Sequence, residues 1–320
     1  MPSLSIGKQI IQYNHRMTNP HQLDGVYAAA ITPLTPSDKI DFDQVPALLG
    51  FLARRGCHGA LLLGTTGEGP SFAPDERTAL LRAAVNIRHE FPYFKLLAGT
   101  GTPSLEETVA NTRAAFDFGF DGVVVLPPYY FRNATDEGLF IWFSRIIQSA
   151  VPRGAALLGY HFPSITGVPL SIDLLARLKD RFPDQFAGLK DSSGSLEHAQ
   201  QLGQRFGQDI LTMVGNDRIL SPALVAHASG CITAMANLCS PYLRRVWDAH
   251  QNGASDAEAQ SKLDLGRSIL DRYPPAPPVI KALISRKHNF PRWSVRPPLL
   301  DLPAEVEARV MVEMDAVFYD

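Results

Sequence analysis

The chain has 320 residues, 45% apolar and 19% charged, a composition typical of a globular protein large enough to bury a substantial core. Its formal net charge of −2 gives no electrostatic reason to expect nucleic acid or an anionic membrane as a partner, and no apolar run is long enough to span a bilayer. Three cysteines, none in a CxxC pair, predict neither a disulfide framework nor structural zinc and favour a reducing, cytoplasmic setting.

Residues 1–24 are expected to form an N-terminal arm that precedes the folded domain. Residues 1–22 carry basic side chains and no acidic ones, which leaves a transit peptide as the alternative. The arm lacks a long apolar stretch, so a secretory signal is not expected.

Eight short apolar runs follow, each of strand length and apolar on both faces, as parallel strands covered by helices should be. They are residues 26–31, 59–64, 95–99, 122–126, 155–160, 186–190, 211–215 and 230–235. Amphipathic segments with helix signals lie between them. Pro74 opens one such segment, Ser104 and Glu107 form a capping-box pattern in another, and Gly119 suits the left-handed end of that helix.

This alternation predicts an α/β fold, a (β/α)8 TIM barrel, over residues 25–250. An open doubly wound sheet is the alternative, but no dinucleotide fingerprint follows the first strand. Residues 251–320 are expected to form a C-terminal helical extension, with helices near 256–272, 277–287 and 302–318.

In such barrels the catalytic groups lie where the strands end. Lys190 ends the sixth run, in the sequence GLKDSSG, where partial burial disfavours the ammonium and leaves an amine able to form a Schiff base. The alternative is a lysine whose stem packs while its head reaches water. Tyr160 ends the fifth run and is a candidate for proton transfer, or else an amphipathic side chain lining a pocket.

The second run ends in GTTGEG, with Gly64, Thr65 and Thr66 at its start. Converging backbone N–H groups and two hydroxyls there suit a small carboxylate, although a plain strand-to-loop turn is also consistent. Thr65 is placed to pass a hydrogen bond to Tyr160, and Tyr130, after the fourth run, to extend this chain of hydroxyls.

Other polar residues carry weaker signals. His58 precedes a strand, at the end of a barrel associated with stability. The nine histidines show no ligand spacing, so no metal site is predicted. Asp191, beside Lys190, is expected to orient a loop or pair with a neighbour.

Five motifs in order together resemble one family: GTTGE, PYY, Y-x-x-P-x-x-T-G, G-x-K-D-S-S-G and a helical extension, between about Gly25 and residues 295–299. This pattern is similar to the dihydrodipicolinate synthase/N-acetylneuraminate lyase family of class I, pyruvate-dependent aldolases and lyases. The resemblance implies a Schiff base between pyruvate and a lysine, with no other cofactor and no metal. It also implies a homotetramer.

By this resemblance Lys190 is the Schiff-base lysine and Tyr160 the proton-transfer residue. The hydroxyls of Thr65 and Thr66 hold the pyruvate carboxylate, and Tyr130 reaches into the site of a neighbouring subunit. Gly64 belongs to the same turn, and Ile232 lines the pocket near pyruvate.

Two positions depart from the family pattern. His161 stands where asparagine is usual, and Ile165 stands where dihydrodipicolinate synthases place an arginine that binds the carboxylate of the second substrate. An isoleucine cannot make that bidentate pair. Asp217 and Arg218 follow the seventh run, where relatives contact acceptor hydroxyls; Arg218 binds an acid group or pairs with a nearby carboxylate.

The sequence therefore predicts a Schiff-base aldolase or lyase that cleaves a 2-keto-3-deoxy sugar acid or a 4-hydroxy-2-oxo acid to pyruvate and an aldehyde. The alternatives are a dihydrodipicolinate synthase acting on aspartate semialdehyde, and a non-catalytic carboxylate-binding protein of the same fold. Hydratase or dehydratase chemistry from the same Schiff base also remains open, and a phosphate-sugar barrel enzyme is a weaker reading.

Overall fold

The computed structural model describes residues 23–318, so the predicted N-terminal arm lies almost entirely outside the described residues. Eight parallel strands form a closed barrel in chain order. The strands are β1 (Gly25–Ala29), β2 (Gly59–Leu62), β3 (Lys95–Gly99), β4 (Gly122–Val125), β5 (Ala156–His161), β6 (Phe186–Asp191), β7 (Leu211–Val214) and β8 (Gly230–Thr233).

The barrel closes between its first and last strands. β1 pairs in parallel with β8, from Gly25 opposite Gly230 to Ala28 opposite Thr233. The open-sheet alternative is therefore wrong, and the predicted (β/α)8 barrel is confirmed. Each apolar run in the sequence corresponds to a strand. The runs are apolar on both faces because every strand residue except the two ends of β3 is buried.

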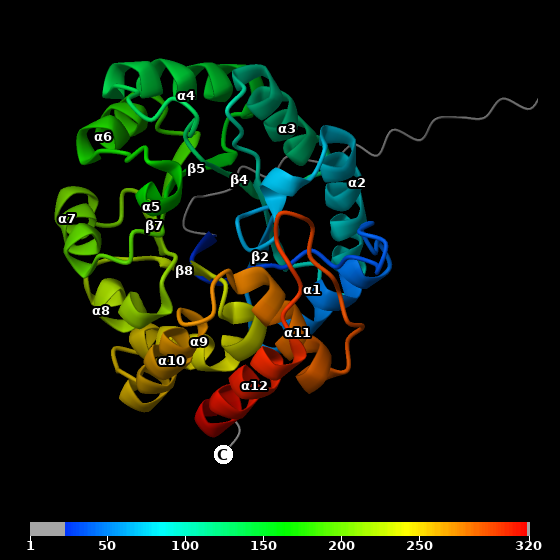
Figure 1. Cartoon of the computed structure of the whole chain (residues 1–320). Helices are drawn as coiled ribbons and strands as arrows, with labels where there is room; N and C mark the ends of the chain where they lie inside the picture. The colour runs from blue at the N-terminus through cyan, green and yellow to red at the C-terminus, as the bar shows by residue number, and fades with distance from the viewer. Residues whose placement is uncertain (1–22, 319–320) are drawn as a thin grey trace, which may run out of the picture.

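Helices surround the strands as a ring (Figure 1). The helices of the ring are α1 (Gln44–Arg54), α2 (Pro74–Ala84), α3 (Leu105–Asp117), α4 (Asp136–Ala150), α5 (Pro163–Thr166), α6 (Ile172–Arg181), α7 (Leu196–Phe206), α8 (Leu220–Val225) and α9 (Ala236–Gln251). Three 3-10 turns, at Gly69–Ser71, Val85–His89 and Asp217–Ile219, were not anticipated from the sequence.

The helix signals in the sequence lie where they were expected. Pro74 is the first residue of α2, and the hydroxyl of Ser104 accepts a hydrogen bond from the backbone N–H of Glu107 at the start of α3. Gly119 follows α3 with a φ of 81°, a left-handed conformation that glycine adopts without strain.

The apolar core has two layers, separated by the barrel wall. An inner cluster fills the barrel and includes Tyr27, Leu97, Leu158 and Ile232 together with Tyr160. A larger cluster lies between the strands and the helices. Since side chains alternate along a strand, neighbouring residues of β5 and β6 face different layers.

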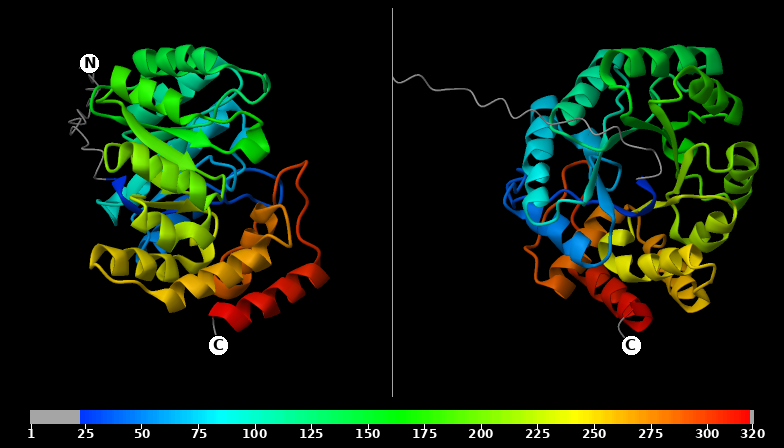
Figure 2. Two further views of the ribbon diagram at one scale, coloured as in Figure 1. Left: turned by 90° about the vertical axis from the view of Figure 1, so that its left-hand side faces the viewer. Right: turned by 180° about the vertical axis from the view of Figure 1, so that it is seen from behind.

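After α9 the chain forms α10 (Ala257–Leu270), α11 (Ala276–His288) and α12 (Ala304–Phe318). These helices pack on α9 and on one another along one flank of the barrel (Figure 2). They match the three helices predicted after residue 250, although the boundary at 250/251 itself stays a prediction. No helix among residues 23–318 is both long enough and apolar enough to cross a membrane.

Candidate active site

Lys190 and Tyr160 lie side by side near the carboxyl ends of β6 and β5. The two residues are register partners in the parallel pair, and both side chains are 3% exposed. The Lys190 Nζ atom lies 4.1 Å from the centre of the Tyr160 ring. The barrel thus places an amine and a phenol together in a site nearly closed to water.

The environment of Tyr160 makes its hydroxyl more acidic. Burial alone would raise the pKa of Tyr160, but the charge of Lys190 and hydrogen bonds from Thr65, Lys190 and Ser192 outweigh burial and lower that pKa. The Thr65 hydroxyl lies 3.4 Å from the phenol oxygen. A phenol of lowered pKa exchanges protons near neutral pH more readily than a free tyrosine.

The GTTGEG turn after β2 lies beside this pair. Leu63 and Glu68 bracket the turn with φ values of 57° and 56°, both in the left-handed region that non-glycine residues seldom adopt. Thr66 is buried and Thr65 is partly buried. Successive backbone amides in such a mixed-handed turn form an anion-binding concavity.

A pocket opens between this turn and the barrel interior. The residues that line it include Gly64, Thr65 and Tyr160 from the predicted site, together with Leu61, Leu63, Pro70, Arg77, Gly99, Gly101, Val124 and Leu126. Three predicted residues from two strand ends therefore share one cavity. Ile232 is fully buried in the inner cluster that also contains Tyr160.

Tyr130 lies away from this group within its own chain. Its side chain is 76% exposed and packs edge-on against Phe131, at 5.2 Å between ring centres. Within residues 23–318 no hydrogen bond joins Tyr130 to Thr65 or Tyr160. Its role in a neighbouring subunit therefore stays a prediction.

The residues predicted to contact the acceptor differ in their exposure to solvent. Ile165, on the short helix α5, is 53% exposed. Asp217 is fully buried, accepts a hydrogen bond from Thr233 and lies 3.3 Å from the Arg267 guanidinium. Burial raises the pKa of Asp217, and Arg267 partly offsets that rise.

Arg218 faces the extension. Its guanidinium donates to Ser268 at 2.8 Å and forms an ion pair with Asp271 at 3.3 Å, both on or next to α10. Because Asp217 and Arg218 are each held by the extension, their direct contact with an acceptor stays a prediction.

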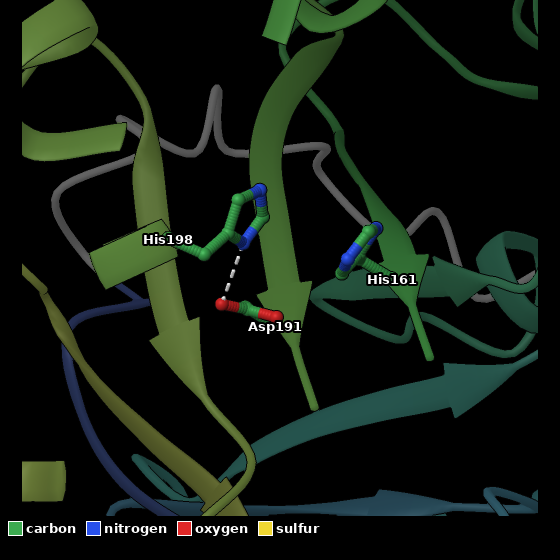
Figure 3. A group of neighbouring side chains, drawn as sticks. All are labelled: His161, Asp191 and His198. Atoms are coloured by element: carbon green, nitrogen blue, oxygen red, sulfur yellow. Dashed lines mark hydrogen bonds and ion pairs between the residues drawn. The ribbon is translucent and has the colours of Figure 1, made fainter. Parts of the chain in front are cut away.

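Figure 3 shows His161, Asp191 and His198, whose potential metal-ligand atoms all lie within 4.8 Å of one another. His198 Nδ1 lies 2.9 Å from Asp191 Oδ2, and the His161 ring stacks on the His198 ring at 4.6 Å. Burial opposes ionisation of Asp191, but hydrogen bonds from His198 and the backbone of Ser193 lower its pKa. Asp191 therefore pairs with a neighbour, as one of its two expected roles requires.

The tautomer of His161 disfavours a metal at this cluster. Its Nδ1 accepts a hydrogen bond from the backbone N–H of Leu170 at 3.0 Å. Burial lowers the pKa of His161, with Asp191 acting in the opposite direction, so the ring is neutral and its one proton lies on Nε2. A protonated nitrogen has no lone pair for a cation, so the donor set fits a hydrogen-bonded network better than a metal centre.

Sequence reasoning missed two features of the site. Ser192 helps to lower the pKa of Tyr160. A Cβ atom on residue 215 would lie 2.0 Å from the Ser192 hydroxyl, so glycine is required at position 215. The second is the buried pair of Glu68 and Lys281, at 2.5 Å. The sequence signals available for Glu68 and Ser192 were the GTTGEG motif and the strand-end position of GLKDSSG.

Comparisons with known proteins show which proteins this chain is similar to. The model of the dihydrodipicolinate synthetase family matches residues 22–317. An uncharacterized DapA-like lyase of Chloroflexus aurantiacus is 36% identical, covering 92% of this chain and 96% of the relative. A 4-hydroxy-tetrahydrodipicolinate synthase of Synechococcus sp. (strain CC9902) is 30% identical, covering 93% and 97%.

Solved structures show the same fold. Dihydrodipicolinate synthase from Agrobacterium tumefaciens superposes with a TM-score of 0.82 at 30% identity, covering 92% of this chain and 99% of that chain. YagE, a prophage protein from Escherichia coli K12 solved in complex with pyruvate, superposes with a TM-score of 0.86, covering 92% and 98%. Its identity of 24% supports the fold alone.

Proposed function

Because this chain belongs to the dihydrodipicolinate synthetase family, whose members are lyases that act through a pyruvate Schiff base, we propose that Lys190 carries that Schiff base. The chain is accordingly a class I aldolase or lyase. The observation that carries the residue assignment is the buried contact of Lys190 with Tyr160, whose pKa is lowered.

In the cleavage direction, the amine of Lys190 adds to the ketone of a 2-oxo acid, and loss of water leaves an iminium ion. Tyr160 then removes the proton from the hydroxyl on C4. The C3–C4 bond breaks, its electron pair moves to the iminium to form an enamine, and the aldehyde leaves. Protonation at C3 and hydrolysis of the imine release pyruvate and restore the amine.

The two threonines have separate roles in this proposal, substrate binding and orientation of Tyr160. The hydroxyl of Thr66 and the amides of the turn bind the substrate carboxylate, and this orients the ketone toward Lys190. Thr65 holds the phenol of Tyr160 by a hydrogen bond, supported by their 3.4 Å separation. The iminium supplies the electron sink, so the proposed reaction uses no metal and no organic cofactor.

Ile165 supports one class of acceptor over another. Its apolar, half-exposed side chain offers no charge to a second carboxylate, which favours a sugar-derived or other neutral aldehyde over aspartate semialdehyde. The alternative is 4-hydroxy-tetrahydrodipicolinate synthesis, the activity named for the Synechococcus relative. A non-catalytic binding protein does not explain why Lys190, Tyr160 and Thr65 are all retained.

We also propose a homotetramer in which Tyr130 completes the site of a neighbouring subunit. The exposed Tyr130–Phe131 pair supports this, because large aromatic side chains at a surface are typical of protein contacts. A cytoplasmic location is part of the same proposal, and the three free, buried cysteines are consistent with it.

Trapping with pyruvate and borohydride tests the central assignment. Reduction of the imine leaves a stable carboxyethyl group, which peptide mass mapping is expected to locate on Lys190. The matched control is Lys190→Arg, which keeps a cation but cannot form the imine at neutral pH. A folded wild-type protein that carries no adduct at Lys190 would overturn the mechanism.

The acceptor is identified by a panel of aldehydes incubated with pyruvate and analysed by product mass. The panel includes glyceraldehyde, glycolaldehyde and aspartate semialdehyde. We expect greater turnover with the hydroxyaldehydes. A higher kcat/KM for aspartate semialdehyde establishes the alternative, whereas a Lys190 adduct without turnover on an extended panel favours the non-catalytic protein.

A further inference from the structure

We propose that Glu68 and Lys281 are positioning residues of the pyruvate site, because their buried ion pair fixes the Thr65–Thr66 turn to the C-terminal extension. This inference depends on the proposed function, in which the turn binds the substrate carboxylate. It gives the extension a part in substrate binding rather than a purely structural one.

The pair is the most completely buried ion pair between Lys or Arg and a carboxylate in residues 23–318. Both side chains are 1% exposed, and Lys281 Nζ lies 2.5 Å from Glu68 Oε1. The second carboxylate oxygen accepts the backbone N–H of Arg296 at 2.9 Å. Lys281 also donates to the Ser294 carbonyl at 2.7 Å, so each end of the pair has a further partner from the extension.

Glu68 transmits this anchoring to the turn through its own backbone. Its φ of 56° is strained for a residue with a side chain, and such a conformation persists only where the surroundings hold it. Its N–H donates to the Thr65 carbonyl at 3.1 Å, and the next N–H, of Gly69, donates to the Gly64 carbonyl at 3.1 Å. The anchored residue therefore closes the turn that presents Thr65 and Thr66.

The same stretch of the extension also holds the far end of the loop. The Arg296 guanidinium donates to both carboxylate oxygens of Glu76, at 2.6 and 2.7 Å, and lies over the Phe72 ring at 4.5 Å. The chain from Gly64 to Glu76 is thus held at two points by residues more than 200 positions away.

General stability does not by itself require this arrangement, since apolar side chains often replace a buried ion pair without loss. An apolar pair would lack the directed hydrogen bonds that hold residue 68 in its left-handed backbone conformation. The geometry of the pair therefore points to a role in orienting the turn that binds the pyruvate carboxylate.

The test compares Glu68→Gln with Asp121→Asn. Asp121 lies at the opposite end of the barrel, before β4, and accepts from Arg88 at 2.7 Å and from the Leu96 N–H at 2.8 Å. Like Glu68, Asp121 is a carboxylate that accepts from a backbone amide and pairs with cations, in this case Arg88 and Lys95, but it lies far from the turn. Pyruvate affinity is measured by the concentration dependence of borohydride trapping, and thermal unfolding is measured in parallel.

We expect Glu68→Gln to weaken pyruvate half-saturation at least tenfold, and Asp121→Asn to change it less than twofold despite a comparable loss of thermal stability. Equal half-saturation in all three proteins, or equal weakening in both variants, overturns the inference. If Glu68→Gln does not fold, Lys281→Arg replaces it: at least threefold weakening supports the inference and unchanged binding overturns it. Absence of any wild-type adduct instead overturns the proposed function.

Discussion

Substitution of Ile165 by arginine is expected to open the site to aspartate semialdehyde. Ile165 lies on the four-residue helix α5 and is 53% exposed, so a longer side chain extends toward solvent without overpacking the core. Its backbone N–H donates to the Phe162 carbonyl at 3.1 Å, a bond that the substitution leaves intact. The guanidinium then offers two parallel donors to the carboxylate of the acceptor.

The magnitude follows from the exposure of this position. A hydrogen bond to a charged group contributes about 1.5–3 kcal/mol, and solvent screening at a half-exposed rim favours the lower end of that range. About 1.5 kcal/mol corresponds to roughly a tenfold rise in kcat/KM for aspartate semialdehyde. Trapping of pyruvate on Lys190 is expected to stay within about twofold of wild type, because Ile165 is predicted to contact the acceptor and not pyruvate.

The assay measures initial rates at saturating pyruvate with aspartate semialdehyde varied, and product is quantified by mass. Ile165→Gln is the matched control, since glutamine is long and polar but lacks the charge and the two parallel N–H donors of arginine. An equal gain in the glutamine variant, or no gain in the arginine variant, would show that Ile165 does not face the acceptor.

Three further predictions concern the proton-transfer residue, acid stability and subunit sharing. Thr65→Val removes a hydrogen bond that lowers the pKa of Tyr160, so the rising limb of the pH–rate profile should move to higher pH and turnover at pH 7 should fall about fivefold; an unmoved limb contradicts the relay. Burial lowers the pKa of His58 to about 4 from an ordinary value of 6.5. The stability that depends on neutral His58 is therefore present above pH 6.5 and is lost as the pH falls toward 4, by up to about 3 kcal/mol. Thermal unfolding of His58→Gln at pH 8 and pH 5 should show a smaller loss on acidification than wild type, and an equal loss argues against this assignment. Mixed oligomers of Lys190→Arg and Tyr130→Phe should regain about a quarter of wild-type activity. With equal amounts of the two variants, about half of the subunit pairs that share sites contain one of each, and one of the two sites in such a pair has both Lys190 and Tyr130. No recovery indicates that Tyr130 acts within its own chain or not at all.

The strands and the candidate residues at their ends could be selected from the sequence because their signals are local. A buried parallel strand must be apolar on both faces, which makes each run visible in a single window of sequence. Once the strands are assigned, their ends select Lys190, Tyr160 and Thr65 as candidates, and the family resemblance supplies their predicted roles. Pro74 and Gly119 are likewise interpretable from backbone preferences alone.

The remaining features depend on contacts between distant segments. Glu68 and Lys281 are 213 positions apart, and no local pattern relates them. Asp217 follows a strand and was therefore predicted to contact the acceptor, yet Arg267 of the extension and Thr233 of the next strand bind its carboxylate. The network of His161 and His198 is equally invisible, because it requires knowing that β5 and α7 are neighbours.

Because β1 pairs with β8, the barrel can close only late in the synthesis of this protein. The hydrogen-bonding edge of β1 has no strand partner on one side until residues 230–233 have emerged from the ribosome. The anchor for the Thr65–Thr66 turn arrives later still, with Lys281 and Arg296. Most of the chain must therefore exist before its first strand is fully paired, a long-range requirement that slows folding and leaves a nascent sheet edge for chaperones to protect.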